Sequence, residues 1–269
     1  MADELGFNEE YEALRLRRDG LREQCAELLE MLAHFETTVK PAITSQYMLL
    51  VGRFEYRVYE LTIEIKRWKR RFEMHRAALN RNEKPDAVAI EAALDGEFAE
   101  YAETVKKHIE EIKEADQYAH AEKLTAEESN DLRLLYHDAA KKLHPDLNPE
   151  QPESARNLWL QIQNAYNDGN WEKFKFLAGM VDGVISEEKT FEDNEHAMAR
   201  LKDAIARLEE KHKALQTRLN DMKSRPPFVH EEFLDDEDKV KERQEQLSLQ
   251  IKLLERRVGE YEELWKHGP

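Results

Sequence analysis

The residues best suited to chemistry in this sequence are His144, Pro145 and Asp146, within the segment YHDAAKKLHPDLNPE (residues 136–150). Pro145 cannot continue a helix and disfavours helical backbone at His144, so the triplet is predicted to lie in a loop directly after a helix. A proline-fixed loop can hold an imidazole and a carboxylate outward at low entropic cost on binding, which suits recognition of a partner. The alternative is a simple helix stop in which Asp146 hydrogen-bonds locally.

Helices are predicted on both sides of this loop. The run Thr125-Ala-Glu-Glu128 has the form of a capping box, which predicts a helix from about Thr125 to about Leu143. After the turn-prone LNPEQPE, the next helix is expected to carry WLQIQNAY (residues 159–166) and to end at NDGN. A short third helix over WEKFKFLAGMV would turn Trp171, Phe174 and Leu177 inward.

These residues resemble the J domain of the DnaJ co-chaperones, over about residues 122–178. The resemblance implies two antiparallel helices flanking the His-Pro-Asp loop, which would dock on a DnaK-type heat-shock chaperone and stimulate its ATP hydrolysis. His144, Pro145 and Asp146 stand where the family keeps the loop that contacts the chaperone. The positions that match the core between the family's helices are Leu132, Tyr136, Trp159, Ile162, Ala165 and Tyr166.

The resemblance also implies a basic docking face on the helix before the loop. Arg133, Lys141 and Lys142 are the candidates for this face, which would turn toward an acidic patch of the chaperone. Asp146 is expected to pair with a cationic group of the chaperone's ATPase module. His137 and Asp138 occupy positions that are usually basic in the family, and the family's short first helix is not visible before Thr125.

An alternative function stays open beside the co-chaperone. The J-like helices can be a packing module that stimulates no chaperone, in a structural or adaptor protein whose coiled coils carry the interactions. The two hypotheses differ in the exposure of His144 and Asp146, because a co-chaperone needs both side chains outward on an uncovered helix face.

The remainder of the chain is predicted to be all-α and elongated. Charged residues make up 36% of the sequence, while Gly and Pro number only 9 and 8, which favours long solvated helices. We expect an N-terminal long-helix region over 1–121, with a helix to Pro41, a second to about residue 80 and a third folding back on the second. The J-like domain would cover 122–180. Heptad spacing in two further segments predicts an antiparallel coiled-coil hairpin over 190–269.

The composition limits the partners. A net charge of −16 argues against affinity for nucleic acid or an anionic membrane surface, since both require a basic footprint. No signal peptide or membrane-spanning stretch is expected, and with Cys25 as the single cysteine we expect a cytoplasmic protein. The predicted partners are a DnaK-type chaperone, a client or partner protein on the coiled coils, and a second copy of the chain.

No catalytic residue, metal site or cofactor is predicted, because no carboxylate pair, nucleotide loop or hydrolase elbow is present. His212, at a heptad core position, is interpreted as a polar register residue rather than a metal ligand. Cys25 lies on an apolar stripe and is interpreted as a small buried hydrophobe. The basic run IKRWKRRF (residues 65–72) is interpreted as a solvated helix face, with RNA contact as the alternative.

Overall fold

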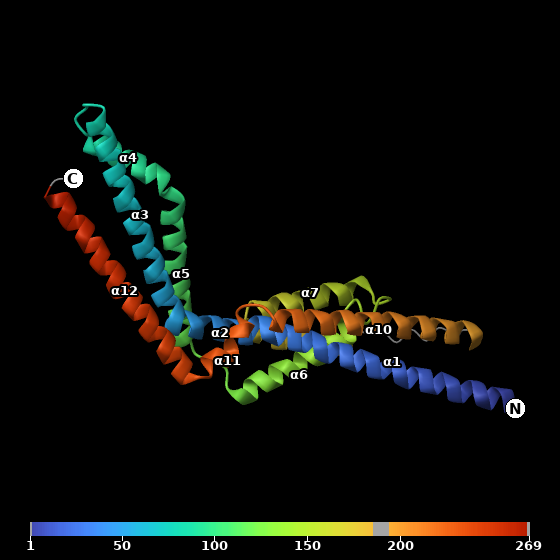
Figure 1. The fold of residues 1–269 in the computed structure, drawn as a ribbon. Helices are drawn as coiled ribbons and strands as arrows, with labels where there is room; N and C mark the ends of the chain where they lie inside the picture. Colours follow the sequence, from blue (N-terminus) through green and yellow to red (C-terminus); the bar gives the residue numbers. More distant parts are fainter. Residues whose placement is uncertain (1, 185–193, 268–269) are drawn as a thin grey trace. The chain divides into compact units, whose positions relative to one another are not determined.

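The computed structural model describes residues 2–184 and 194–267, and within them every regular element is a helix (Figure 1). The all-α prediction is confirmed. The chain divides into two compact units, one formed by residues 1–40 and 122–228 and the other by 41–121 and 229–269. Each unit therefore combines an N-terminal with a C-terminal part of the sequence.

The first unit contains the J-like helices together with two long helices. Its elements are α1 (Ala2–His34), η1 (Phe35–Val39), α6 (Ala126–Leu143), α7 (Glu153–Asn167), α8 (Trp171–Ala178), α9 (Val181–Val184) and α10 (Asn194–Lys223). The second unit contains mainly α2 (Lys40–Tyr47), η2 (Met48–Gly52), α3 (Arg53–Asn80), α4 (Ala87–Glu97), α5 (Ala99–His120), η3 (Phe228–His230), α11 (Glu231–Leu234) and α12 (Glu237–Lys266).

Helical backbone continues through Pro41 instead of stopping there. A π-helical turn, η1, directly precedes α2, and the N–H of Lys40 bonds to the carbonyl of Phe35. The wider turn is a known way to accommodate a residue that lacks an amide and crowds the preceding turn. A second π-helical turn ends at Gly52, where a Cβ would stand 2.6 Å from the Met48 sulfur, so only glycine fits without a shift.

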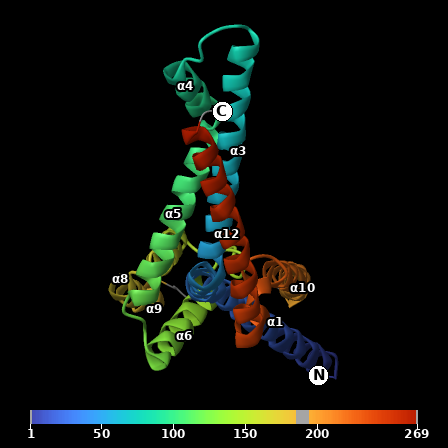
Figure 2. The ribbon, with the colours of Figure 1, turned by 60° about the vertical axis from the view of Figure 1, so that its left-hand side comes forward.

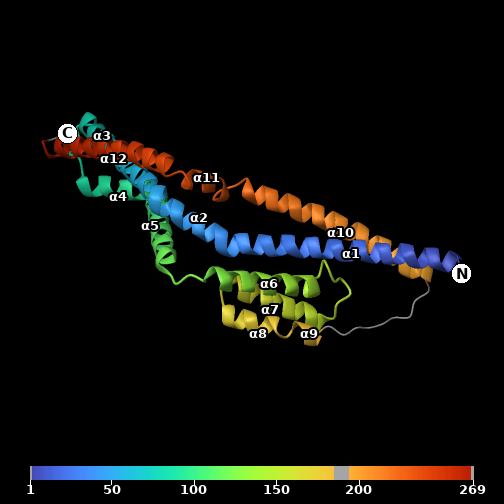
Figure 3. The same ribbon diagram turned by 90° about the horizontal axis from the view of Figure 1, so that it is seen from below.

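In the first unit, α1 pairs with α10 in parallel (Figure 3). Glu10 accepts from Lys202, and Glu209 accepts from Arg17, each pair being 192 residues apart in sequence. A constant separation means that the two helices run in the same direction. The seam between them is apolar and contains Cys25, Ala26, Leu32, Leu208, Leu215 and Leu219.

In the second unit, α3 pairs with α12, also in parallel (Figure 2). Leu61, Ile65 and Val258 form the buried cluster of this seam. Toward its end, Phe72 meets the ring of Trp265 edge to face at 5.3 Å between centroids. Near its start, Gln244 donates 2.7 Å to the carbonyl of Leu50.

The expected third helix is two helices, α4 and α5, both packed on α3. Asp86 begins α4 by accepting from the amides of Val88 and Ala89. Glu91 of α4 accepts from both Arg67 and Arg71 of α3. The basic run 65–72 is thus partly neutralised by carboxylates of the same unit rather than being an open cationic face.

The predicted C-terminal hairpin is not what the structure contains. Its two arms, α10 and α12, belong to different units, and each pairs with an N-terminal helix. Heptad spacing requires an apolar seam to be buried but does not say against which helix, and the apolar stripes of α1 and α3 supply the partners. The expected boundary at residue 190 lies outside the described residues. The expected division into three consecutive regions is likewise replaced by two units of mixed origin.

We predict that Leu61→Ala lowers the free energy of unfolding by about 2–4 kcal/mol, because it leaves a cavity in the buried seam between α3 and α12. Urea unfolding followed by circular dichroism measures the change. Leu249→Ala on the exposed face of α12 is the matched control, and it should change stability by less than about 0.5 kcal/mol. Equal effects of both substitutions would contradict this pairing.

Candidate functional site

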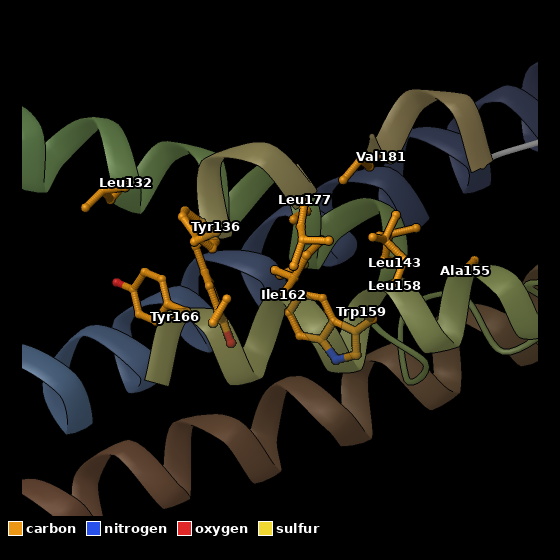
Figure 4. Close-up of a cluster of buried hydrophobic side chains, with 14 residues drawn as sticks. Leu132, Tyr136, Leu143, Ala155, Leu158, Trp159, Ile162, Tyr166, Leu177 and Val181 are labelled. Carbon is orange, nitrogen blue, oxygen red and sulfur yellow. The ribbon is translucent and has the colours of Figure 1, made fainter. Parts of the chain in front are cut away.

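Helices α6 and α7 form an antiparallel hairpin around a core of aromatic rings (Figure 4). The ring of Tyr136 lies 4.5 Å from that of Tyr166 and 5.5 Å from that of Trp159, centroid to centroid. Further along α6, His144 meets Trp159, so residues later in α6 contact residues earlier in α7. Burial raises the pKa of Tyr136 to about 12, so its hydroxyl stays neutral.

The six core positions derived from the resemblance are all buried: Leu132, Tyr136, Trp159, Ile162, Ala165 and Tyr166. Phe174 and Leu177 of α8 pack on the same core, as their spacing predicted. The capping box is also present. Thr125 accepts from the amide of Glu128, whose carboxylate accepts from the amide of Thr125 at 2.9 Å.

Side chains of the loop close the end of α6. The last carbonyls of a helix lack intrahelical donors, and here Asn148 donates to Lys141 and His144 while Gln151 donates 2.8 Å to Leu143. The loop is therefore fixed to the helix that precedes it. This gives the His-Pro-Asp segment one defined conformation.

His144 lies mostly inside the hairpin, with 12% of its side chain exposed. Its Nδ1 accepts the backbone amide of Asp146 at 3.1 Å, and its ring packs edge to face on Trp159. Burial lowers the pKa of His144 to about 4, and the nearby Lys211 lowers it further, against the opposite effect of Asp146. The imidazole is consequently neutral near pH 7, with its proton on Nε2.

Asp146 is half exposed and forms an ion pair with Lys211 of α10. In the sequence analysis this carboxylate was expected to be available for a cationic group on a partner. The structure instead gives it a cationic partner within the same unit. The pair is open to solvent on both sides, so Lys211 is exchangeable for a competing cation.

Arg133 is held by Glu30 of α1 through a two-pronged contact. Nε donates to one carboxylate oxygen at 2.5 Å and a terminal nitrogen donates to the other at 3.1 Å. Only 9% of the Glu30 side chain is exposed, so this pair is shielded from water. The guanidinium pKa of Arg133 is raised, first of all by this hydrogen bond.

One turn apart on the same face of α6, Lys141 and His137 both meet Glu23 of α1. Lys141 forms an ion pair with this carboxylate, and the Nε2 of His137 lies 3.2 Å from it. The hydrogen bond from Lys141 is the main reason that the pKa of Glu23 is lowered. Arg22 adds a bond of 3.1 Å to the backbone carbonyl of Lys141.

Lys142 faces another direction and bridges two carboxylates. Its Nζ donates to Asp138, one turn earlier in α6, at 2.8 Å and to Asp182 of α9 at 2.7 Å. These two bonds raise the pKa of Lys142. The candidate basic face is therefore divided, with Arg133 and Lys141 on α1 and Lys142 toward α9.

The structure thus brings the predicted loop and core together and pairs each charged member of the candidate site internally. The residues that sequence reasoning missed are the partners: Glu23, Glu30, Asp182 and Lys211. One signal was available, because Glu23 and Glu30 are seven residues apart and so share one face of a helix. Nothing in the spacing said that this face would meet α6.

The other sequence interpretations have mixed outcomes. Cys25 is fully buried between α1 and α10, and burial raises the pKa of its thiol, which confirms it as a small core residue. Among the described residues, no group of three His, Cys, Asp or Glu side chains is arranged to hold a metal ion. In the same part of the chain, no helix has the length and apolar content that a bilayer crossing requires.

Comparison with known proteins adds no relative: no protein-family model, curated protein or solved structure matches this chain.

We predict that His144 makes the protein less stable in mild acid. Its folded pKa is lowered below the unfolded value, so the unfolded chain binds more protons as the pH falls from about 6.5 toward 4. Its contribution to the free energy of unfolding should fall by about 1–2 kcal/mol between pH 7 and pH 5. Urea unfolding at both pH values measures this loss.

His144→Gln keeps a polar side chain but cannot titrate, so its unfolding free energy should fall less over the same pH interval. His120→Gln on the exposed end of α5 is the control and should retain the wild-type pH dependence. Equal pH dependence in His144→Gln and wild type would contradict the burial of a neutral imidazole at this position.

Proposed function

We propose that this chain is a co-chaperone of the J-domain type, which docks on a DnaK-type heat-shock chaperone through His144, Pro145 and Asp146 and stimulates its ATPase. The observation that carries the proposal is the hairpin of α6 and α7, whose aromatic core holds a His-Pro-Asp loop in one conformation. The residues that resemble the J domain in sequence occupy the matching places in this hairpin.

The geometry of the loop supports a binding role. His144 is anchored on Trp159 and accepts the amide of Asp146, which orients the backbone at the tip. The Asp146 carboxylate is half exposed, and its internal partner Lys211 shows that it can pair with a cation. A chaperone would offer a competing cationic group in place of Lys211.

In this proposal the ATP chemistry belongs to the chaperone, and this chain contributes recognition alone. Its working compartment would be the cytoplasm. The seams of α1 with α10 and of α3 with α12 leave outward faces, such as the exposed Leu249 and Leu253 of α12, on which a client or a second copy would bind.

A second candidate is a structural or adaptor protein in which the J-like hairpin is a packing module. The covering of the basic face favours this candidate, because Arg133 and Lys141 are already bound to α1 carboxylates. The two candidates differ in whether that covering is permanent. A co-chaperone requires a state in which the face becomes accessible to another protein.

We predict that the wild-type chain raises steady-state ATP hydrolysis by a DnaK-type chaperone from the same organism, and that Asp146→Asn abolishes the increase. The substitution removes the charge that would pair with the chaperone but keeps the shape of the side chain. Coupled-enzyme measurement of ADP release gives the rate over a titration of this protein.

Glu150→Gln, which removes a charge from an exposed position of the same loop, is the matched control and should stimulate like wild type. Loss of stimulation in both variants would assign the effect to net charge rather than to the triplet. If neither the folded wild-type chain nor a variant with its docking face released stimulates the chaperone, the adaptor candidate is favoured.

A further inference from the structure

A cationic stripe of α6 is covered by α1. Arg133, His137 and Lys141 follow one another at intervals of four residues, so they lie along one face of the helix. All three meet α1 through two carboxylates, Glu30 and Glu23. The covered stripe thus has the charge that an acidic partner surface would recognise, and α1 supplies the acidic surface.

The two faces of α1 differ in the kind of contact they make. Toward α10, α1 presents an apolar seam that includes Cys25, Ala26 and Leu32. Toward α6, it presents the carboxylates of Glu23 and Glu30, with a smaller apolar contribution from Leu29 and Ala33. Ion pairs can be exchanged for other ion pairs, whereas an apolar seam has no such substitute in water.

The hairpin under α1 has a core of its own. The buried side chains around Tyr136, Trp159 and Phe174 come from α6, α7, α8 and α9, and α1 adds only half-buried residues at the edge. Withdrawal of α1 from α6 would leave this core in place. The hairpin can therefore remain folded while its cationic stripe is exposed.

We propose, resting on the co-chaperone function above, that α1 is a built-in competitor of the chaperone. Glu23 and Glu30 occupy the stripe of Arg133, His137 and Lys141 and keep it closed, and an acidic surface of the chaperone displaces them. Lys211 acts in the same sense on the loop, because it holds Asp146. The pairing of α1 with α10 is kept in the open form.

The test compares the double variant Glu23→Gln/Glu30→Gln with Glu9→Gln/Glu27→Gln, which removes the same charge from exposed positions of the same helix. Circular dichroism establishes that both are folded. In the chaperone ATPase assay, the first variant should stimulate at least threefold more than wild type at a subsaturating concentration. The second should match wild type, and Asp146→Asn in the first background should abolish the effect.

Carbodiimide coupling with peptide mass spectrometry provides a direct measure of the closed form. The ion pair of Glu23 with Lys141 should yield an isopeptide link within the wild-type chain. Addition of the chaperone should lower the yield of this link at least threefold. A Glu10–Lys202 link, between α1 and α10, should keep its yield because that pairing persists.

The outcomes separate the two proposals. If the chaperone is stimulated equally by wild type and by Glu23→Gln/Glu30→Gln, and the Glu23–Lys141 link is unchanged by the chaperone, the competition by α1 is refuted and the co-chaperone function stands. If neither form stimulates although hydrogen exchange shows α1 released from α6 in the variant, the co-chaperone function is refuted, and the competition with it. Should the double variant fail to fold, Glu23→Gln alone replaces it, since Glu23 is more exposed than Glu30.

Discussion

Burial of the apolar stripe along the N-terminal helices is the constraint on which the other elements depend. Cys25 and Leu32 of α1, like Leu61 and Ile65 of α3, cannot be covered by residues of their own helix. A helix from the C-terminal part of the sequence covers each stripe, α10 in one unit and α12 in the other. Once α1 is held by α10, its carboxylates at 23 and 30 stand at fixed positions to meet α6.

The candidate site shows how one helix serves both packing and charge pairing. Successive faces of α6 carry Tyr136 toward α7, Arg133 toward α1 and Lys142 toward α9. A surface that would bind another protein in the J-domain family is thereby built into this chain's own tertiary structure. The same contacts that favour a purely structural role are those that a regulated co-chaperone would have to exchange.

Local features could be predicted from the sequence because neighbouring residues determine them. The start of α6 at Thr125, its end before Pro145 and the inward position of Trp159 follow from hydrogen-bonding capacity, ring geometry and helical spacing. The break between α4 and α5 was missed because no Gly or Pro stands at Phe98 itself.

Long-range pairing could not be predicted in the same way. The stripe of α10 contains residues such as Leu208 and Leu215 that would pack equally well on any apolar helix, so the spacing fitted a hairpin as well as a pairing with α1. The covering of Arg133 was hidden for the same reason, since Glu30 is 103 residues away in sequence. Only the assembled seam decides which charges meet.

The parallel direction of both seams has a consequence for biosynthesis. Two parallel helices need a long connection, and here contacts such as Arg243 with Glu55 join residues 188 positions apart. During translation α3 therefore leaves the ribosome well before α12, with Leu61 and Ile65 uncovered until most of the chain has been made. Such delayed closure slows folding and leaves a nascent chain exposed to aggregation. By this topology, the chain would itself be a client for chaperones while it is being synthesised.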